Sequence, residues 1–377
     1  MIRRVYRRQH PHCHPLWSIV TPNLGCMLPI PLDVADLSCD WLTYAIQAHA
    51  PGAVVTAVTV IDAHSGTTGR ARLAVSCDDD RVPATVFVKL APFTEDRRAF
   101  VDQQGMGVAE ARFYSEVAAE VPVRTPDVFL SEHDADGRYI MVFEDLLAAG
   151  ARYPTAQDHD LATTVDGVID NFAVLHAAFH CSDRFATNGD LAWIEQRSRG
   201  YGSAAPMVEY AVSQIGSDMP SAFHEFVEMY VPNADRIAAL LARGDRTLVH
   251  GDSHIGNMYV APGGVGFLDW AVLGFAPGMR DVAYFIGNSV ATEFRREHEH
   301  RLVSRYCEAL RNDGIELEFD EAWMQYRLQM TTGWVAAVVT AGFGSALQPI
   351  EIGLRATERA NTALVDLGVI EVIASQL

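Results

Sequence analysis

Short apolar runs separated by turn residues dominate the first 150 residues of the chain. Five of these runs have the length and composition of strands: 53–61, 70–76, 84–90, 122–130 and 138–143. Between the third and fourth runs, Val108 to Glu120 carries apolar residues at helical spacing. We therefore predict that residues 27–150 form a lobe with a five-stranded antiparallel sheet and one helix.

From Asp158 onward, apolar positions mostly recur every three to four residues, as in helices. Residues 161–181 predict a central buried helix, in which His176 is a hydrogen-bonded core residue. Further helices are expected near Ser221, Asn233, Met279, Glu293, Asp320 and Pro349. Residues 183–218 are rich in Gly, Ser and Ala and predict a variable insertion or substrate flap. A mostly helical second lobe over 151–377, joined through a hinge near 147–157, makes the fold class α+β.

Length and charge narrow the choice of function. The chain has 377 residues, which suits two lobes better than one core. Its 29 Lys and Arg against 48 Asp and Glu give a net charge of −19. This balance argues against nucleic-acid binding, which needs a basic face, and is compatible with a cationic substrate. Six cysteines without a CxxC pair indicate reduced thiols and a cytoplasmic location.

Two further segments need an interpretation. Residues 1–26 hold His10, His12, Cys13 and His14 among prolines and arginines. Their composition favours a disordered leader, or a start assigned too early with Met27 as the true start; metal binding is the alternative. The uncharged run 328–350 contains glycine and polar residues, and favours a buried helix and a pocket wall over a membrane span.

Residues with chemical potential are concentrated between His250 and Asp269. A loop holding Asp252 and Asn257 precedes a predicted hairpin over 258–268, and Asp269 lies at its far end, so the three side chains can face one point. Asp252 is suited to accept the proton of an acceptor hydroxyl. Asn257 and Asp269 offer oxygen ligands to Mg²⁺. Such a set predicts phosphoryl transfer from a nucleotide.

Lys89 lies in an otherwise apolar predicted strand. Burying an ammonium group without a partner is costly, so its side chain is expected to have one. Glu110 on the following helix is the predicted partner, with Glu116 as the competitor. Lys89 would then contact the α- and β-phosphates of the nucleotide.

A glycine-containing turn, Ser65-Gly66-Thr67-Thr68-Gly69, lies between the first two predicted strands. Small residues there would allow the backbone to approach nucleotide phosphates closely. A plain hairpin turn is the alternative, since the segment does not have the G-x-G-x-x-G pattern.

Together, these motifs resemble those of the aminoglycoside phosphotransferase and choline kinase superfamily. The residues that carry the resemblance are His250-Gly251-Asp252-x-His254-x-x-Asn257, Leu268-Asp269-Trp270, Val88-Lys89, Glu110-Ala111-Arg112-Phe113-Tyr114 and Phe143-Glu144-Asp145-Leu146. The Glu-x-x-Phe-Tyr run and the long helical tail are most similar to the ecdysteroid-kinase-like (CHK kinase-like) branch. The resemblance covers residues 30–375. It departs from the protein-kinase pattern at Trp270-Ala271, where Phe-Gly would stand.

This resemblance implies a bilobal protein-kinase-like fold with ATP or GTP and Mg²⁺ between the lobes. The backbone around Glu144 and Leu146 would bind the nucleotide base. His250 and His254 would hold the loop in shape, with direct substrate contact as the alternative for His254. The acceptor would be a small hydroxyl compound, and the protein a monomer or homodimer.

Three functional hypotheses remain open from the sequence. The leading one is a small-molecule kinase, whose acceptor is cationic by net charge or hydrophobic if Trp334, Val338, Phe343 and Leu347 line the pocket. The second is a non-catalytic nucleotide-binding protein with a kinase fold. The third is an acyl or glycosyl hydrolase that uses Asp252 and Asp269, which leaves Lys89 unexplained.

Overall fold

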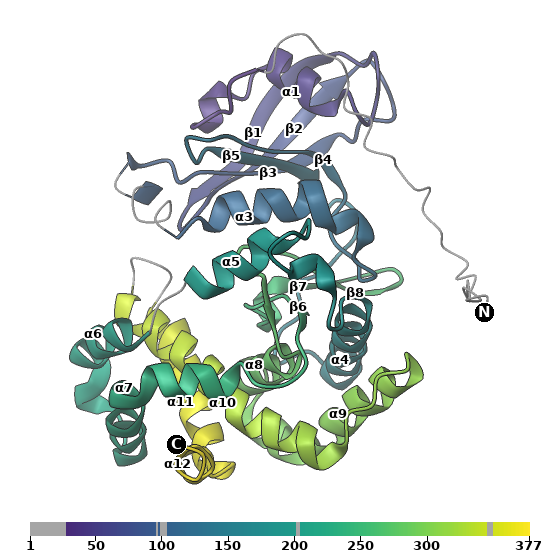
Figure 1. Cartoon of the computed structure of the whole chain (residues 1–377). Coiled ribbons are helices and arrows are strands. Elements are labelled where there is room, and N and C mark those ends of the chain that lie inside the picture. Colours follow the sequence, from purple (N-terminus) through teal and green to yellow (C-terminus); the bar gives the residue numbers. More distant parts are fainter. Residues whose placement is uncertain (1–27, 96, 99–103, 201–203, 345–349) are drawn as a thin grey trace.

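The structure, a computed structural model, describes residues 28–95, 97–98, 104–200, 204–344 and 350–377. Figure 1 shows two lobes, an upper one built around a sheet and a lower one built mainly of helices. We call residues 28–150 the N-lobe and residues 151–377 the C-lobe. The predicted leader and its histidine cluster lie outside the described residues.

The N-lobe contains five strands and two principal helices among its described residues. They are α1 (Cys39–Ile46), β1 (Val55–Ser65), β2 (Gly69–Cys77), β3 (Thr85–Leu90), α3 (Met106–Arg112), β4 (Val128–His133) and β5 (Tyr139–Glu144). The strands form an antiparallel sheet in the order β1-β2-β3-β5-β4. The predicted five-stranded lobe is therefore confirmed.

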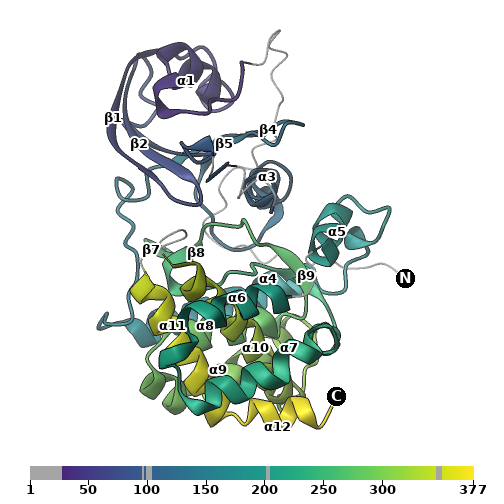
Figure 2. The same cartoon turned by 90° about the vertical axis from the view of Figure 1, so that its left-hand side faces the viewer.

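Side chains of β2 and β3 alternate between the two faces of this sheet. Ala71 and Leu73 are buried on the face that packs against α1. Arg70 lies directly opposite Lys89 in the register, so both side chains lie on the other face, toward α3. The turned view shows α1 and α3 on opposite sides of the sheet (Figure 2). The register thus places two cations on the face that looks toward the C-lobe.

Two N-lobe elements differ from the prediction. The run 122–130 becomes a strand only from Val128. The expected helix over 108–120 is α-helical only to Arg112, and continues as a π-helical turn, Phe113–Val117, and a 3-10 turn, Ala118–Glu120. The π turn buries both Phe113 and Tyr114, a packing preference that local periodicity does not encode.

The C-lobe is mainly helical, with four short strands near its junction with the N-lobe. Its helices are α4 (Leu161–Ala178), α5 (Ala192–Gly200), α6 (Ala205–Ile215), α7 (Ser221–Leu241), α8 (Met279–Ser289), α9 (Thr292–Asn312), α10 (Phe319–Phe343), α11 (Ile350–Asp366) and α12 (Val369–Ala374). Its strands are β6 (Thr247–Val249), β7 (Met258–Ala261), β8 (Gly264–Phe267) and β9 (Gly274–Ala276). They pair as β6-β9 and β7-β8, both antiparallel.

One prediction for the C-lobe is wrong, and one segment contains helices that were not predicted. Residues 183–218 contain α5 and α6, although no helix was expected there. A separate helix does not begin at Asn233, because α7 continues through Pro232. The buried face of α7 runs on from Phe226 and Tyr230 to Ala234 and Ile237, and this burial outweighs the backbone hydrogen bond that proline removes.

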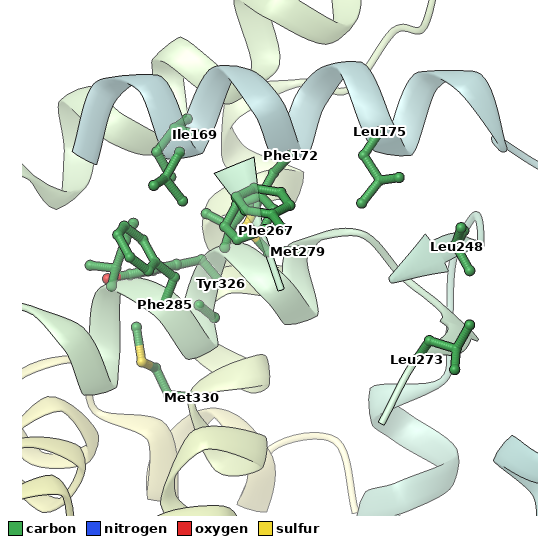
Figure 3. Packing of buried hydrophobic residues seen from close by; sticks show 14 of the residues in the cluster. Ile169, Phe172, Leu175, Leu248, Phe267, Leu273, Met279, Phe285, Tyr326 and Met330 are labelled. Atoms are coloured by element: carbon green, nitrogen blue, oxygen red, sulfur yellow. The ribbon is translucent and has the colours of Figure 1, made fainter. Parts of the chain in front are cut away.

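The centre of the C-lobe core lies beneath α4. In Figure 3, Ile169, Phe172 and Leu175 extend from α4 toward residues of the hairpin and of α8. The ring centroid of Phe172 is 5.2 Å from that of Phe267 on β8. His176 on the same helix is buried, and its Nδ1 lies 2.8 Å from the Tyr306 hydroxyl, so the predicted core role is confirmed.

The apolar tail contributes to the core of the C-lobe. Trp334 and Val338 on α10 are fully buried, and Trp334 packs against Phe223 and Phe226. These two residues are therefore core residues and do not support a hydrophobic acceptor, and Leu347 lies outside the described residues. No helix in the described part of the chain combines the length and apolarity needed to cross a bilayer.

Candidate active site

The loop after β6 has a shape that only glycine allows at one position. Gly251 has φ = 84°, in the left-handed region. A Cβ atom there would lie 2.1 Å from the carbonyl oxygen of Val272, so a side chain has no room. The chain therefore turns sharply between His250 and Asp252.

Asp281, near the start of α8, anchors this loop. Its fully buried carboxylate accepts hydrogen bonds from the backbone N–H of His250 (2.6 Å) and of Gly251 (2.9 Å). Its own carbonyl accepts a third from the Ser253 hydroxyl (3.0 Å). Burial acts to raise the pKa of Asp281, but His176, His250 and the Gly251 N–H outweigh it and lower the pKa. The charge is therefore retained inside the lobe.

Both motif histidines contact the loop. His250 Nδ1 accepts from the Asp252 N–H (3.3 Å), which leaves the proton on Nε2 to be donated to the Leu268 carbonyl (3.0 Å). The ring of His254 accepts from the Gly256 N–H (3.1 Å), and its Nε2 lies 3.6 Å from Asp252 Oδ2. His250 thus ties the loop to the segment that carries Asp269.

Asp252 has a partner on each carboxylate oxygen. Tyr284 on α8 donates its hydroxyl to Oδ1 (2.6 Å), and Asn257 Nδ2 lies 3.2 Å from Oδ2. The same amide nitrogen donates to the Asp252 carbonyl (2.8 Å). Because Nδ2 is committed in this way, Asn257 Oδ1 points away from Asp252. The side chain of Asp252 is still 32% exposed, so a small molecule can reach it.

A second group of charges joins the two lobes. Lys89 Nζ lies 2.5 Å from Glu110 Oε2 and 2.9 Å from Asp269 Oδ1. Arg70 Nη2 lies 3.7 Å from Asp269 Oδ2. The competitor Glu116 pairs instead with Arg112, four residues earlier. The structure therefore pairs Lys89 with Glu110 and brings Asp269 of the C-lobe to both N-lobe cations.

Burial and charge set the protonation of this group. Burial acts to raise the pKa of Asp269, but Lys89 and Arg70 hold it at about 2. For Glu110 burial prevails over Lys89 and raises the pKa to about 7. Burial opposes the charge of Lys89, but Asp269 and Glu110 outweigh it and raise its pKa. Asp269 and Lys89 are thus both ionised at neutral pH.

Asp269 also has an unusual backbone. Its φ of 64° is in the left-handed region, which non-glycine residues rarely occupy. The next residue, Trp270, is fully buried and stacks on Phe113 of the N-lobe, with ring centroids 4.1 Å apart. This packing holds the turn in place and offsets the cost of the left-handed backbone at Asp269.

The predicted phosphate turn is a tight hairpin. Ser65 pairs with Gly69 at the ends of β1 and β2, and the Gly66 N–H donates to the Thr68 carbonyl (3.0 Å). A Cβ on Gly69 would lie 2.4 Å from the Phe93 ring, so this glycine is required for packing within the lobe. Thr67 lies between these residues, at the tip of the turn.

The segment between the lobes is held by internal hydrogen bonds. Glu144 ends β5, and its Oε1 accepts from the Asp127 N–H (3.0 Å). The Leu146 carbonyl accepts from the Ala151 N–H (2.9 Å). That carbonyl is thus already engaged within the protein.

Arg70, Asp281 and Tyr284 were not singled out from the sequence. Arg70 appeared there only as the start of a strand, although strand register places it opposite Lys89. Asp281 and Tyr284 stand among apolar residues in α8. An acid within a buried apolar run implies a buried partner, which is a usable signal for Asp281; Tyr284 offers no comparable signal.

A family model described as "Phosphotransferase enzyme family" matches residues 69–325. Similar solved structures include a choline kinase from Streptococcus pneumoniae, 17% identical, which covers 87% of this chain and 98% of its own, with a TM-score of 0.50. A choline kinase from Cryptosporidium parvum Iowa II is 12% identical over 88% and 98%, with a TM-score of 0.53. The GDP complex of aminoglycoside 2'-phosphotransferase-IIIa is 12% identical over 86% and 98%, with a TM-score of 0.50. No curated protein matched the sequence.

Proposed function

Because the chain belongs to the phosphotransferase enzyme family, we propose that it transfers the γ-phosphoryl group of ATP or GTP to a hydroxyl group of a small molecule. The observation that carries this proposal is the cross-lobe group of Lys89, Glu110 and Asp269 beside the loop of Asp252 and Asn257. The GDP complex of the similar aminoglycoside phosphotransferase supports a nucleotide cofactor. The Glu110–Tyr114 run supports the CHK kinase-like branch.

The donor set fits a bound Mg²⁺ ion. Asp269 retains its negative charge, and Asn257 Oδ1 is turned away from the amide nitrogen that Asp252 engages. Oxygen atoms of carboxylate and carboxamide groups are the ligands Mg²⁺ prefers. When bound, the ion would neutralise charge that develops on the phosphates.

Each remaining residue has a role that follows from its contacts. Lys89 is oriented by Glu110. When a nucleotide binds, Lys89 would replace its contact with Asp269 by contacts with phosphate oxygens. The ammonium group would thus keep an anionic partner, which favours the exchange. Arg70 would add a second cation on the same face of the sheet. Asp252 would orient the acceptor hydroxyl and accept its proton as the phosphoryl group is transferred.

The decisive experiment separates nucleotide binding from transfer. We expect Mg²⁺ with ATP or GTP to raise the melting temperature of the parent protein and of Asp252→Asn, but much less that of Asp269→Asn. Phosphoryl transfer to a panel of hydroxyl compounds, followed with γ-labelled nucleotide, should be lost in both variants. Removing the base of such a site costs about 10²-fold or more in kcat.

The same experiment distinguishes the alternatives. A non-catalytic nucleotide-binding protein would show the stabilisation by nucleotide without any transfer in the parent protein. A hydrolase would act without nucleotide. Unchanged transfer in both Asp252→Asn and Asp269→Asn would contradict the proposed mechanism.

A further inference from the structure

Three metal-binding side chains meet at a place that the phosphoryl-transfer mechanism does not use. His180 and Cys181 follow the end of α4, and Asp245 immediately precedes Arg246 and β6. One donor atom from each of the three lies within 4.8 Å of the other two. His180 Nε2 and Asp245 Oδ2 are 3.4 Å apart. Residues 64 positions apart in the sequence thus present a nitrogen, a sulfur and an oxygen to one point.

The backbone holds these donors in place. Cys181 has φ = 47°, a left-handed conformation that non-glycine residues rarely adopt. The Cys181 N–H donates to the Arg246 carbonyl (2.8 Å). Close by, the Thr247 hydroxyl donates to the His176 carbonyl (2.8 Å). Two hydrogen bonds therefore fix the segment after α4 against the start of β6.

The nearest guanidinium group has its own partners. The Arg246 side chain pairs with Glu195 on α5 through contacts of 2.9 and 2.5 Å, and its guanidinium lies over the Phe275 ring at 4.4 Å. Its charge is thus balanced by Glu195. Asp245 and Cys181 remain directed toward His180.

We propose that His180, Cys181 and Asp245 form a binding site for Zn²⁺. Imidazole nitrogen, thiolate sulfur and carboxylate oxygen are the ligands that Zn²⁺ takes in proteins, whereas Mg²⁺ and Ca²⁺ take oxygen ligands. The two anionic ligands balance the charge of the ion. Three protein ligands leave a fourth position for water or another small ligand.

A cavity lies beside the three residues, next to the open coordination position. The cavity has a volume of about 550 Å³, and Cys181 and Asp245 are among its lining residues. Phe275 of β9 lines it as well. Because β6 and β9 flank the loop of Asp252, a metal ion here would stabilise the strand that leads into that loop.

Zinc titration of the full chain, in the absence of nucleotide, tests this site. We expect isothermal titration calorimetry to detect a Zn²⁺ site in the parent protein that Cys181→Ser, His180→Ala and Asp245→Asn each weaken by about tenfold or more. Asp245 is largely exposed, so Asp245→Asn is the variant least able to disturb folding. Melting temperatures measured with EDTA should agree among the variants.

The leader needs its own control, because its histidines and Cys13 can also bind metal. We expect Co²⁺, used as a probe, to give a thiolate-to-metal absorption band that disappears in Cys181→Ser. Cys13→Ser and Cys77→Ser should both retain it. If Cys181→Ser and Asp245→Asn bind Zn²⁺ like the parent and keep the Co²⁺ band, the three residues are only a surface ion pair beside a free thiol, and the proposal fails.

Discussion

At the residue scale, the most informative contact is the one between Tyr284 and Asp252. The phenol donates to the carboxylate that would accept the proton of the acceptor hydroxyl. Burial, with the charge of Asp252 in addition, raises the pKa of Tyr284 well above its ordinary value. The phenol therefore stays protonated and remains a donor at neutral pH.

We expect Tyr284→Phe to lower kcat about fivefold, because a hydrogen bond to a charged group contributes roughly 1.5–3 kcal/mol and part of it orients the carboxylate. The KM for nucleotide should be unchanged. Steady-state kinetics would measure both. Tyr326→Phe is the matched control, since it removes another buried phenol whose hydroxyl donates to Glu299 instead. Equal kcat values for Tyr284→Phe and the parent would contradict a positioning role.

Gly251 allows backbone strain and steric clash to be separated. Gly52 has nearly the same φ, 85° against 84°, but an added Cβ would meet nothing within 4 Å. We expect Gly52→Ala to cost about 1 kcal/mol, as a left-handed alanine does. Gly251→Ala should cost clearly more and abolish transfer, because its Cβ would displace Val272 or the loop. Urea unfolding measures the difference; similar costs for both variants would show that the clash is relieved easily.

At the scale of elements, α8 organises the loop of Asp252. Asp281 holds the backbone of His250 and Gly251, and Tyr284 holds Asp252 one turn later. The helix is fixed by its buried face against α10, where Gly287 leaves room for Met330. The geometry of the candidate site is therefore set by helix packing more than by the loop itself.

We expect Asp281→Asn to reduce the free energy of unfolding by about 3 kcal/mol, since it leaves buried N–H groups poorly paired. The folded-state pKa of Asp281 is lowered, so its contribution is present above the unfolded pKa of about 3.9 and is lost as pH falls further. The difference from the parent should thus be constant from about pH 5 to 8 and shrink below about pH 4. Urea unfolding at several pH values tests this.

Asp79→Asn provides the comparison for that experiment. Asp79 is a surface carboxylate paired with the exposed Arg81, and its pKa is also lowered, through hydrogen bonds from Arg81. Exposed pairs contribute little to stability, so this variant should unfold like the parent at neutral pH. If Asp79→Asn lowered the free energy of unfolding as much as Asp281→Asn, burial of the carboxylate would not be the cause of the Asp281 effect.

At the scale of the whole molecule, contacts of two kinds fix the lobes against each other near the site. One kind is ionic, from Lys89 and Arg70 to Asp269. The other is apolar, the stack of Phe113 on Trp270. One core cluster accordingly runs from Phe113 and Phe143 of the N-lobe to Trp270 and Phe285 of the C-lobe. The junction between the lobes is thus packed like a protein interior, which keeps Lys89, Glu110 and Asp269 aligned.

We expect Phe113→Leu and Phe226→Leu to cost similar stability, about 1–1.5 kcal/mol, because both rings are fully buried and the change nearly conserves volume. Only Phe113→Leu should raise the KM for nucleotide and lower kcat, because Phe226 packs against Trp334 within the C-lobe. Kinetics below the melting temperature of both variants would test this. Equal kinetic effects would indicate general loosening instead of misalignment of the lobes.

The sequence by itself determined the elements whose signals are local. The strand runs and the helix α4 follow from composition and spacing, and Lys89, Asp252, Asn257 and Asp269 were singled out as candidate site residues in the same way. An ammonium group in an apolar strand is improbable unless it has a partner. Two acids and an amide around a hairpin are improbable unless they have a chemical role. Such features carry their physical reason in the sequence.

Only the tertiary structure decided which groups meet. It selected Glu110 over Glu116 for Lys89, brought Asp281 and Tyr284 to the loop, and placed Trp334 in the core. It also joined His180 and Cys181 to Asp245. These outcomes depend on helix packing and on contacts between residues distant in sequence, whose energies arise only when the chain is folded. A residue's periodicity shows that it is buried, but the neighbours that surround it decide what it does.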